Sequence, residues 1–305
     1  MTTKQGLLQN FARVVVALLV ALLFAAAGAG LAQAQTSSAA LLARHGALRA
    51  QLANNAFQRP LYLESSQNAG DQQGDVYAVV EQPFTVVSQA LQGMDNWCEL
   101  LILHLNVKHC RASGVAAASV LSVSVGKKFD QPLADTYKVN FSYRVLDARP
   151  DFLQVKLAAE NGPLGTNNYS LVFEAVPLDA QRSFIHMSYS YAYGTAARMA
   201  MKVYLNTIGS GKVGFTVTGR QADGQPVYVD GVRGVVERNT MRYYLAIEAY
   251  LGSVARPASE QAEKRLRDWF AATERYPLQL RELEQSEYLD MKRKELQRQQ
   301  DSKPG

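Results

Sequence analysis

The chain has 305 residues, of which 48% are hydrophobic and 19% are charged, and its formal net charge is +5 at pH 7. A chain of this length and apolar content can fold around a sizeable core and still carry extensions. The small excess of basic residues lacks the signature of nucleic-acid-binding proteins, so we expect no nucleic-acid partner.

The first 34 residues have the order of segments that is typical of a secretory signal peptide. Lys4 and Arg13 precede an apolar run at 14–27, and the small-x-small triplet Ala32-Gln33-Ala34 follows it. The run covers 14 residues (14 to 27), fewer than the ~20 that span a bilayer, which favours cleavage over a membrane anchor. We expect cleavage after Ala34, a periplasmic location and no transmembrane segment in the mature chain. The mature chain would carry 30 basic and 27 acidic residues, a net charge of +3.

The next elements alternate between helix and strand. Residues 35–59 predict an Ala/Leu-rich helical lead-in that ends at Pro60. Strands are predicted at 61–65 and 75–81, with a turn at 68–74 between them. Pro83 begins a helical stretch, and Asp95 is expected to cap a second one that runs to Leu103.

The two cysteines of the chain, Cys98 and Cys110, are twelve residues apart. In an oxidising compartment this spacing favours a disulfide. Two buried free thiols are an alternative, and a metal site with His104 and His109 is another. The offsets match no standard zinc pattern, so we expect no metal.

The middle of the chain alternates apolar and polar residues with a period of two, which predicts antiparallel strands. The alternation covers 137–145, 153–157, 169–173, 185–193 and 213–217. Tyr189, Tyr191 and Tyr193 share one face of their strand, and His186 lies on the opposite, solvent-facing side. The glycine-rich segment 209–214 is interpreted as a hairpin turn, because Val213 replaces the hydroxyl residue that a phosphate-binding loop needs. We therefore expect no cofactor.

The period then changes to that of a helix over 235–254, with few charges and therefore burial over most of its surface. Residues 258–300 predict a charged helical tail, expected to pack on the domain or be solvated, or to dock a partner through Trp269 and Phe270. Arg238 and Arg242 lie one turn apart near the start of the long helix. A carboxylate from the sheet or an anionic ligand is expected to offset their charge.

The order of strand, two short helices, antiparallel strands and one long helix resembles the START-like superfamily, which includes polyketide cyclases and the birch-pollen allergen group. The likeness rests on Asp75 to Glu81, on Gln82-Pro83-Phe84 with Asn96-Trp97, and on Arg233 to Val236 leading into the helix. It covers residues 60–255, between the lead-in and the tail at 256–305. The resemblance implies an α+β fold in which an antiparallel sheet curls around the long C-terminal helix (a helix-grip fold).

The same resemblance implies a cavity for a hydrophobic molecule between sheet and helix. A tyrosine-rich core without a cavity is equally compatible with the residues. The candidate lining comes from the tyrosine strand and from the long helix: Tyr189, Tyr191, Tyr193, Glu237, Arg238, Arg242, Tyr243, Tyr244, Ile247 and Tyr250.

Three functions follow as hypotheses. The first is an exported protein that binds a hydrophobic small molecule or lipid without chemical change. The second is a cyclase, dehydratase or hydrolase that uses Glu237, Arg238 and a tyrosine in the same cavity. The third is a ligand-free scaffold whose helical tail binds an envelope protein.

Overall fold

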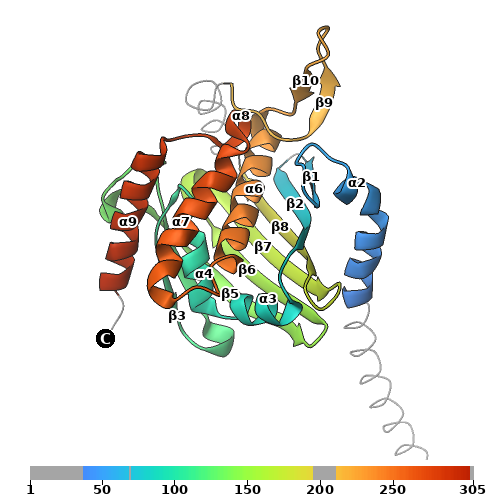
Figure 1. Cartoon of the computed structure of the whole chain (residues 1–305). Coiled ribbons are helices and arrows are strands. Elements are labelled where there is room, and N and C mark those ends of the chain that lie inside the picture. Colours follow the sequence, from blue (N-terminus) through green and yellow to red (C-terminus); the bar gives the residue numbers. More distant parts are fainter. Residues whose placement is uncertain (1–36, 69, 195–210, 303–305) are drawn as a thin grey trace, which may run out of the picture.

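The computed structural model describes residues 37–68, 70–194 and 211–302 (Figure 1). The predicted signal peptide and the start of the 209–214 segment lie outside the described residues.

Eight antiparallel strands form the main sheet, in the order β1-β2-β8-β7-β6-β5-β4-β3. After β2 the chain leaves the sheet through α3 (Phe84–Leu91) and α4 (Met94–Leu101), re-enters at the far edge as β3, and returns strand by strand until β8 pairs with β2. The strands are β1 (Leu61–Gln67), β2 (Asp71–Val80), β3 (Val107–Ser113), β4 (Val120–Val125), β5 (Tyr137–Arg149), β6 (Phe152–Asn161), β7 (Thr166–Pro177) and β8 (Ser183–Tyr193).

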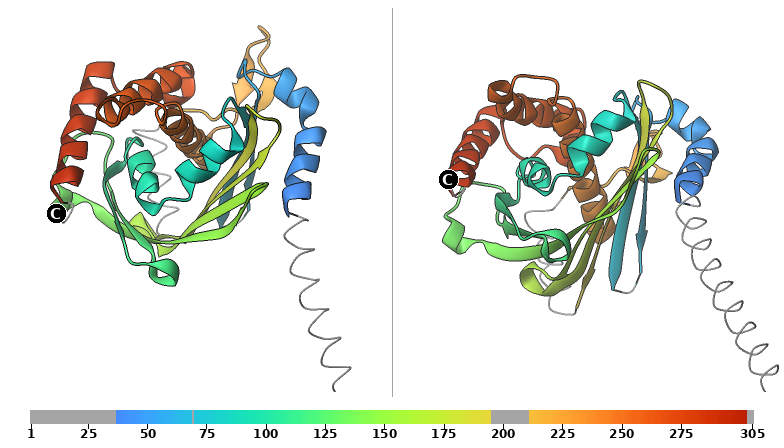
Figure 2. Two further views of the ribbon diagram at one scale, coloured as in Figure 1. Left: turned by 60° about the horizontal axis from the view of Figure 1, so that its bottom comes forward. Right: turned by 90° about the horizontal axis from the view of Figure 1, so that it is seen from below.

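The predicted α+β class is confirmed. The sheet curves, with the long helix α6 (Gly231–Leu251) on its concave side (Figure 2). The helix contacts β1, β2 and β8, and most of its residues are buried, as their apolar spacing predicts. Gly74 of β2 permits this close approach, since a Cβ there would lie 2.3 Å from Thr240 Oγ1 of α6.

The inner face of the sheet carries rows of apolar side chains across the strands. Leu157 of β6 pairs with Tyr143 of β5 and with Leu171 of β7, and Leu171 pairs with Tyr189 of β8. Because the main contacts of α6 are with β1, β2 and β8, the inner face of β4 to β7 is left largely to smaller elements and to the space described below.

The charged tail forms α7 (Ala258–Glu274), α8 (Pro277–Leu280) and α9 (Gln285–Asp301) and packs on the domain. Trp269 is only 1% exposed, and its ring stacks on Tyr288 with centroids 5.0 Å apart. Its indole N–H donates to the backbone oxygen of Arg242. The expectation that a partner could dock through Trp269 is therefore wrong, because this side chain is part of the core.

The lead-in is helical at 37–47 and in α2 (Arg49–Ala53), and it covers the outer face of the sheet (Figure 2). Leu41, Leu48 and Leu52 form a second apolar cluster with Phe184 and Val176 of the sheet. The lead-in therefore buries part of the outer face, which would be exposed to solvent in a fold made of the sheet and α6 alone.

Three local predictions were wrong. Asp71 to Gly74 belong to β2 rather than to a turn, and Gly93, not Asp95, occupies the N-cap of α4. The strand expected at 213–217 begins only at Val217, where β9 (Val217–Arg220) pairs with β10 (Pro226–Tyr228) in a separate ribbon. The strands β3 and β4 were not predicted.

The Cys98–Cys110 disulfide is confirmed, with the Cα atoms 5.1 Å apart, and it ties α4 to β3.

Candidate ligand-binding site

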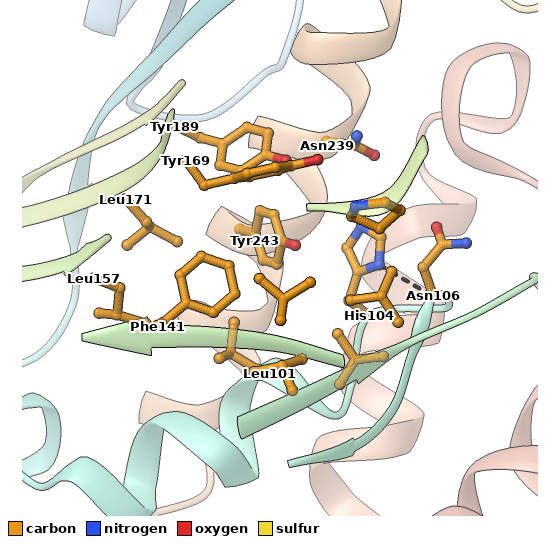
Figure 3. Close-up of a pocket in the computed structure, with 15 residues that line it drawn as sticks. Leu101, His104, Asn106, Phe141, Leu157, Tyr169, Leu171, Tyr189, Asn239 and Tyr243 are labelled. Atoms are coloured by element: carbon orange, nitrogen blue, oxygen red, sulfur yellow. Dashed lines mark hydrogen bonds between the residues drawn. The ribbon is translucent and has the colours of Figure 1, made fainter. Parts of the chain in front are cut away.

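A cavity of about 150 Å³ lies between the inner face of β4 to β8 and the elements that face it (Figure 3). Its walls are mainly aliphatic and aromatic. Apolar lining comes from α4, the start of β3 and the inner rows of the sheet: Leu101, Val107, Val123, Val125, Val139, Phe141, Leu157 and Leu171. The polar lining residues are His104, Asn106, Tyr169, Tyr189, Asn239 and Tyr243. The sequence left open whether the space between sheet and helix is filled by side chains or hollow, and the structure has a cavity there.

A polar pair, His104 and Asn106, lies at one end of the cavity (Figure 3). Figure 3 shows Leu157 and Leu171 at one end of the cavity and His104 and Asn106 at the other. The two polar residues come from the loop that the disulfide closes. Asn106 fixes this loop to the end of β4, because its side-chain amide donates to Gly126 O at 2.7 Å and its own backbone oxygen accepts from Gly126 N.

His104 is held as a neutral ring. The backbone N–H of Asn106 donates to Nδ1 at 3.1 Å, which assigns the imidazole proton to Nε2. Burial is the main cause that lowers the pKa of His104 well below its ordinary value, and the positive charges of Arg242 and Lys292 add to it. The ring lies on Tyr243, with centroids 4.8 Å apart. At neutral pH the ring is therefore a donor at Nε2 and an acceptor at Nδ1.

Tyrosines form the wall between His104 and the sheet. Tyr189 contacts Tyr243 of α6 with ring centroids 5.2 Å apart, and Tyr169 stacks on Tyr191 at 5.5 Å. Tyr193 extends the same cluster along β8. Burial raises the pKa of Tyr189, Tyr191 and Tyr243, so all three stay protonated at any physiological pH.

Of the ten expected cavity residues, Tyr189 and Tyr243 line this cavity. Tyr191 and Tyr193 belong to the adjoining tyrosine cluster. The other apolar candidates on α6 face different neighbours: the Tyr244 hydroxyl donates to Glu248 at 2.8 Å, Arg265 lies 4.1 Å over the Tyr250 ring, and Ile247 is buried in the main core.

Glu237 fastens α6 to the segments around it. The Ser65 and Thr216 hydroxyls donate to Oε1 at 2.5 and 2.6 Å, and the backbone N–H groups of Phe215 and Thr216 donate to Oε2. These bonds take the N–H groups that a strand at 213–217 would have used, which explains why that strand is absent. With both oxygens engaged outside the cavity lining, Glu237 is not placed as an acid or base for a molecule in the cavity.

The two candidate arginines of α6, Arg238 and Arg242, also make protein contacts. Arg238 Nη1 donates to Val213 O at 3.1 Å. Arg242 Nη2 lies 2.8 Å from Glu282 Oε1, and both side chains are nearly buried. The carboxylate that offsets the charge of Arg242 thus comes from the tail rather than from the sheet.

Sequence reasoning missed most of the lining. His104 was considered only as a metal ligand, and Asn106, Tyr169 and Asn239 were not proposed as cavity lining. His186 lies on the outer face as expected, but it is half-buried between Asp75 and Glu174 rather than solvated.

Two further findings concern the described residues alone. No group of His, Cys, Asp and Glu side chains among them is arranged to hold a metal ion. No helix in the same ranges is long and apolar enough to cross a bilayer.

Comparison with known proteins gives distant similarities. No protein-family model matches the chain, and no curated protein matches it. Solved structures similar to it include the Zhui aromatase/cyclase from Streptomyces sp. R1128, at 13% identity over 65% of this chain and 96% of that one, with a TM-score of 0.37. A norcoclaurine synthase point mutant from Thalictrum flavum is similar at 14% identity over 46% of this chain and 86% of that one, with a TM-score of 0.34. Ara h 8.0201 is similar at 13% identity over 46% and 92%, with a TM-score of 0.32.

These similarities are too distant to carry an argument about function. The arrangement of this chain is itself that of a helix-grip fold: an antiparallel sheet that curves around one long helix, with a cavity between the sheet and the elements that face it.

Proposed function

We propose that this protein binds a small hydrophobic molecule in the cavity between the sheet and α6. The observation that carries the proposal is the cavity itself, about 150 Å³ in volume and lined mainly by aliphatic and aromatic side chains. Native cores pack densely and leave few such voids. An apolar cavity of about this volume accepts a ligand as large as benzene.

The volume also restricts the ligand class. Sites for drug-sized ligands occupy roughly 300–1,000 Å³, so the cavity fits a single-ring molecule or a short aliphatic one. Binding of a lipid or of a molecule with several fused rings would require one wall to move. We therefore propose a single-ring compound as the ligand. Binding of a larger ligand would show that a wall of the cavity moves.

Binding can be tested with ethylbenzene and a matched pair of variants. Leu171 lines the cavity, and its neighbour Val172 alternates to the other face of β7. Calorimetric titration should show saturable ethylbenzene binding to the wild type and to Val172→Trp. Leu171→Trp fills the cavity and should reduce binding at least tenfold, by removing the space that the ring occupies. Equal affinity of both variants, or no binding to the wild type, would refute the proposal.

We also propose that the protein is exported and cleaved after Ala34. The order of segments in residues 1–34 supports this, as does the Cys98–Cys110 disulfide, a bond that persists mainly in oxidising compartments. N-terminal sequencing of protein made in its own cell should begin at Gln35. A mature chain that begins at Met1 or Thr2 would contradict cleavage.

A further inference from the structure

His104 has an unused polar atom in the wall of the cavity. The ring is only 3% exposed, and its Nδ1 is occupied by the backbone N–H of Asn106. Nε2, which carries the proton, is buried, and no described residue forms a hydrogen bond of good geometry with it. Buried polar atoms in proteins are almost always paired, so an orphan donor at a cavity indicates a partner from outside the chain.

The surroundings of this atom belong to the same cavity. Asn239 and Tyr243, one turn apart on α6, both line it, and Tyr243 stacks on the imidazole. The Asn239 side chain lies close enough to interact with the ring as a hydrogen-bond partner, which raises the pKa of His104, while its Oδ1 accepts from Arg242 Nη1 at 3.4 Å. Asn239 therefore competes with a ligand for Nε2, and the competition can be measured.

We propose that His104 determines which ligands the cavity accepts, by donating a hydrogen bond from Nε2 to a neutral acceptor oxygen, such as a carbonyl, on a small apolar molecule. The acceptor is neutral because removing a carboxylate from water into an apolar cavity costs more than one hydrogen bond returns. The ligand therefore has its apolar body against Leu157 and Leu171 and its oxygen at the opposite end (Figure 3). This inference rests on the proposed function and adds the chemistry of the ligand to it.

The test compares two ligands with the same carbon skeleton, acetophenone and ethylbenzene, of which only acetophenone carries a carbonyl oxygen. His104→Phe keeps an aromatic ring on Tyr243 and removes the donor. It should weaken acetophenone binding about tenfold and leave ethylbenzene binding within about twofold, since a single hydrogen bond is at stake. His109→Phe, five residues along the chain and outside the cavity lining, is the matched control and should change neither affinity.

A second measurement does not depend on the variant. The ¹⁵N resonance of His104 Nε2 in the full-length wild type should shift on addition of acetophenone and stay in place with ethylbenzene. If His104→Phe changes both affinities equally, or if the selectivity survives in the variant and Nε2 does not shift, the inference is wrong and Asn239 satisfies His104 instead. If the wild type binds neither compound, the proposed function fails, which is a different result.

Discussion

Three side chains of opposite charge, His186, Asp75 and Glu174, lie together and largely buried on the outer face of the sheet. His186 Nε2 lies 2.9 Å from Asp75 and Nδ1 lies 2.8 Å from Glu174, and the ring stacks on Tyr77 with centroids 4.3 Å apart. Burial alone would lower the pKa of His186, but the hydrogen bonds and charges of the two carboxylates outweigh it and raise the pKa to about 9. The folded protein therefore favours the protonated, positively charged form of His186.

This pairing predicts a defined pH dependence. A histidine whose folded-state pKa is about 9, against an ordinary 6.5, adds stability that is complete below about pH 6.5 and is lost as pH rises to 9. His186→Gln should lower the free energy of unfolding by about 2 kcal/mol at pH 6 and by clearly less at pH 9.5. Urea unfolding at both pH values measures this. An equal loss at the two values would show that His186 contributes by packing rather than by charge.

Gly74 is the residue on which the approach of α6 to the sheet depends. Gly74→Ala should destabilise the protein by about 1–3 kcal/mol, because the new methyl group would overlap Thr240 Oγ1. The double variant with Thr240→Ala should recover part of the loss, and a double-mutant cycle measures the recovery. Gly219→Ala, where nothing lies within 4 Å, is the control and should change stability little. Additive effects of Gly74→Ala and Thr240→Ala would contradict the close contact.

At the scale of elements, the C-terminal helix α9 holds the loop that forms the polar end of the cavity. Lys292 Nζ donates to the backbone oxygens of His104 and Val107, both at 2.8 Å, and to Glu295 Oε2 at 2.7 Å. Glu295 also pairs with Lys108 of β3 at 3.0 Å, and all three charged side chains are fully buried. Tyr288 adds a hydrogen bond to Leu103 O. The tail is therefore a structural support of the cavity wall.

Breaking this support should affect stability and binding together. Lys292→Met leaves two backbone oxygens and part of a buried carboxylate without a donor, and should cost about 3–5 kcal/mol of unfolding free energy. Ethylbenzene affinity should fall as well, because His104 and Val107 lose their fixed positions. Lys294→Met makes the same substitution on an exposed position of the same helix and is expected to change stability by less than about 0.5 kcal/mol. Similar losses in both variants would contradict the support role.

The sequence predicts elements better than it predicts the site. The period-two alternation of β5 to β8 and the helical spacing of α6 identify these elements because burial of one face dictates both patterns. The alternation of Leu121 and Val123 with Ser122 and Ser124 in β4 is of the same kind and as long as the one at 153–157, so this strand could have been predicted from the sequence. The strand expected at 213–217 does not form over Phe215 and Thr216, because a distant carboxylate, Glu237, accepts from the N–H groups of these two residues. No local pattern records such a contact.

For the whole molecule, the lining of the cavity depends on how α6 sits across the sheet. The sequence indicates that Tyr189 and Tyr243 face inward, but the half of the sheet that α6 leaves uncovered is a property of the packed fold. His104 and Asn106 reach the cavity because the disulfide, Gly126 and α9 together fix one loop. These three constraints come from segments far apart in the sequence, which is why residue patterns alone did not predict the polar end.

We expect the space between the sheet and α6 to be hollow and to accept a small apolar molecule. Xenon binds such cavities without needing a hydrogen bond, so diffraction from crystals of the protein under xenon pressure tests the claim directly. We expect xenon density among Val139, Leu157 and Leu171, and loss of that density in Leu171→Trp. A wild-type crystal in which side chains fill this space and no xenon binds there would contradict it.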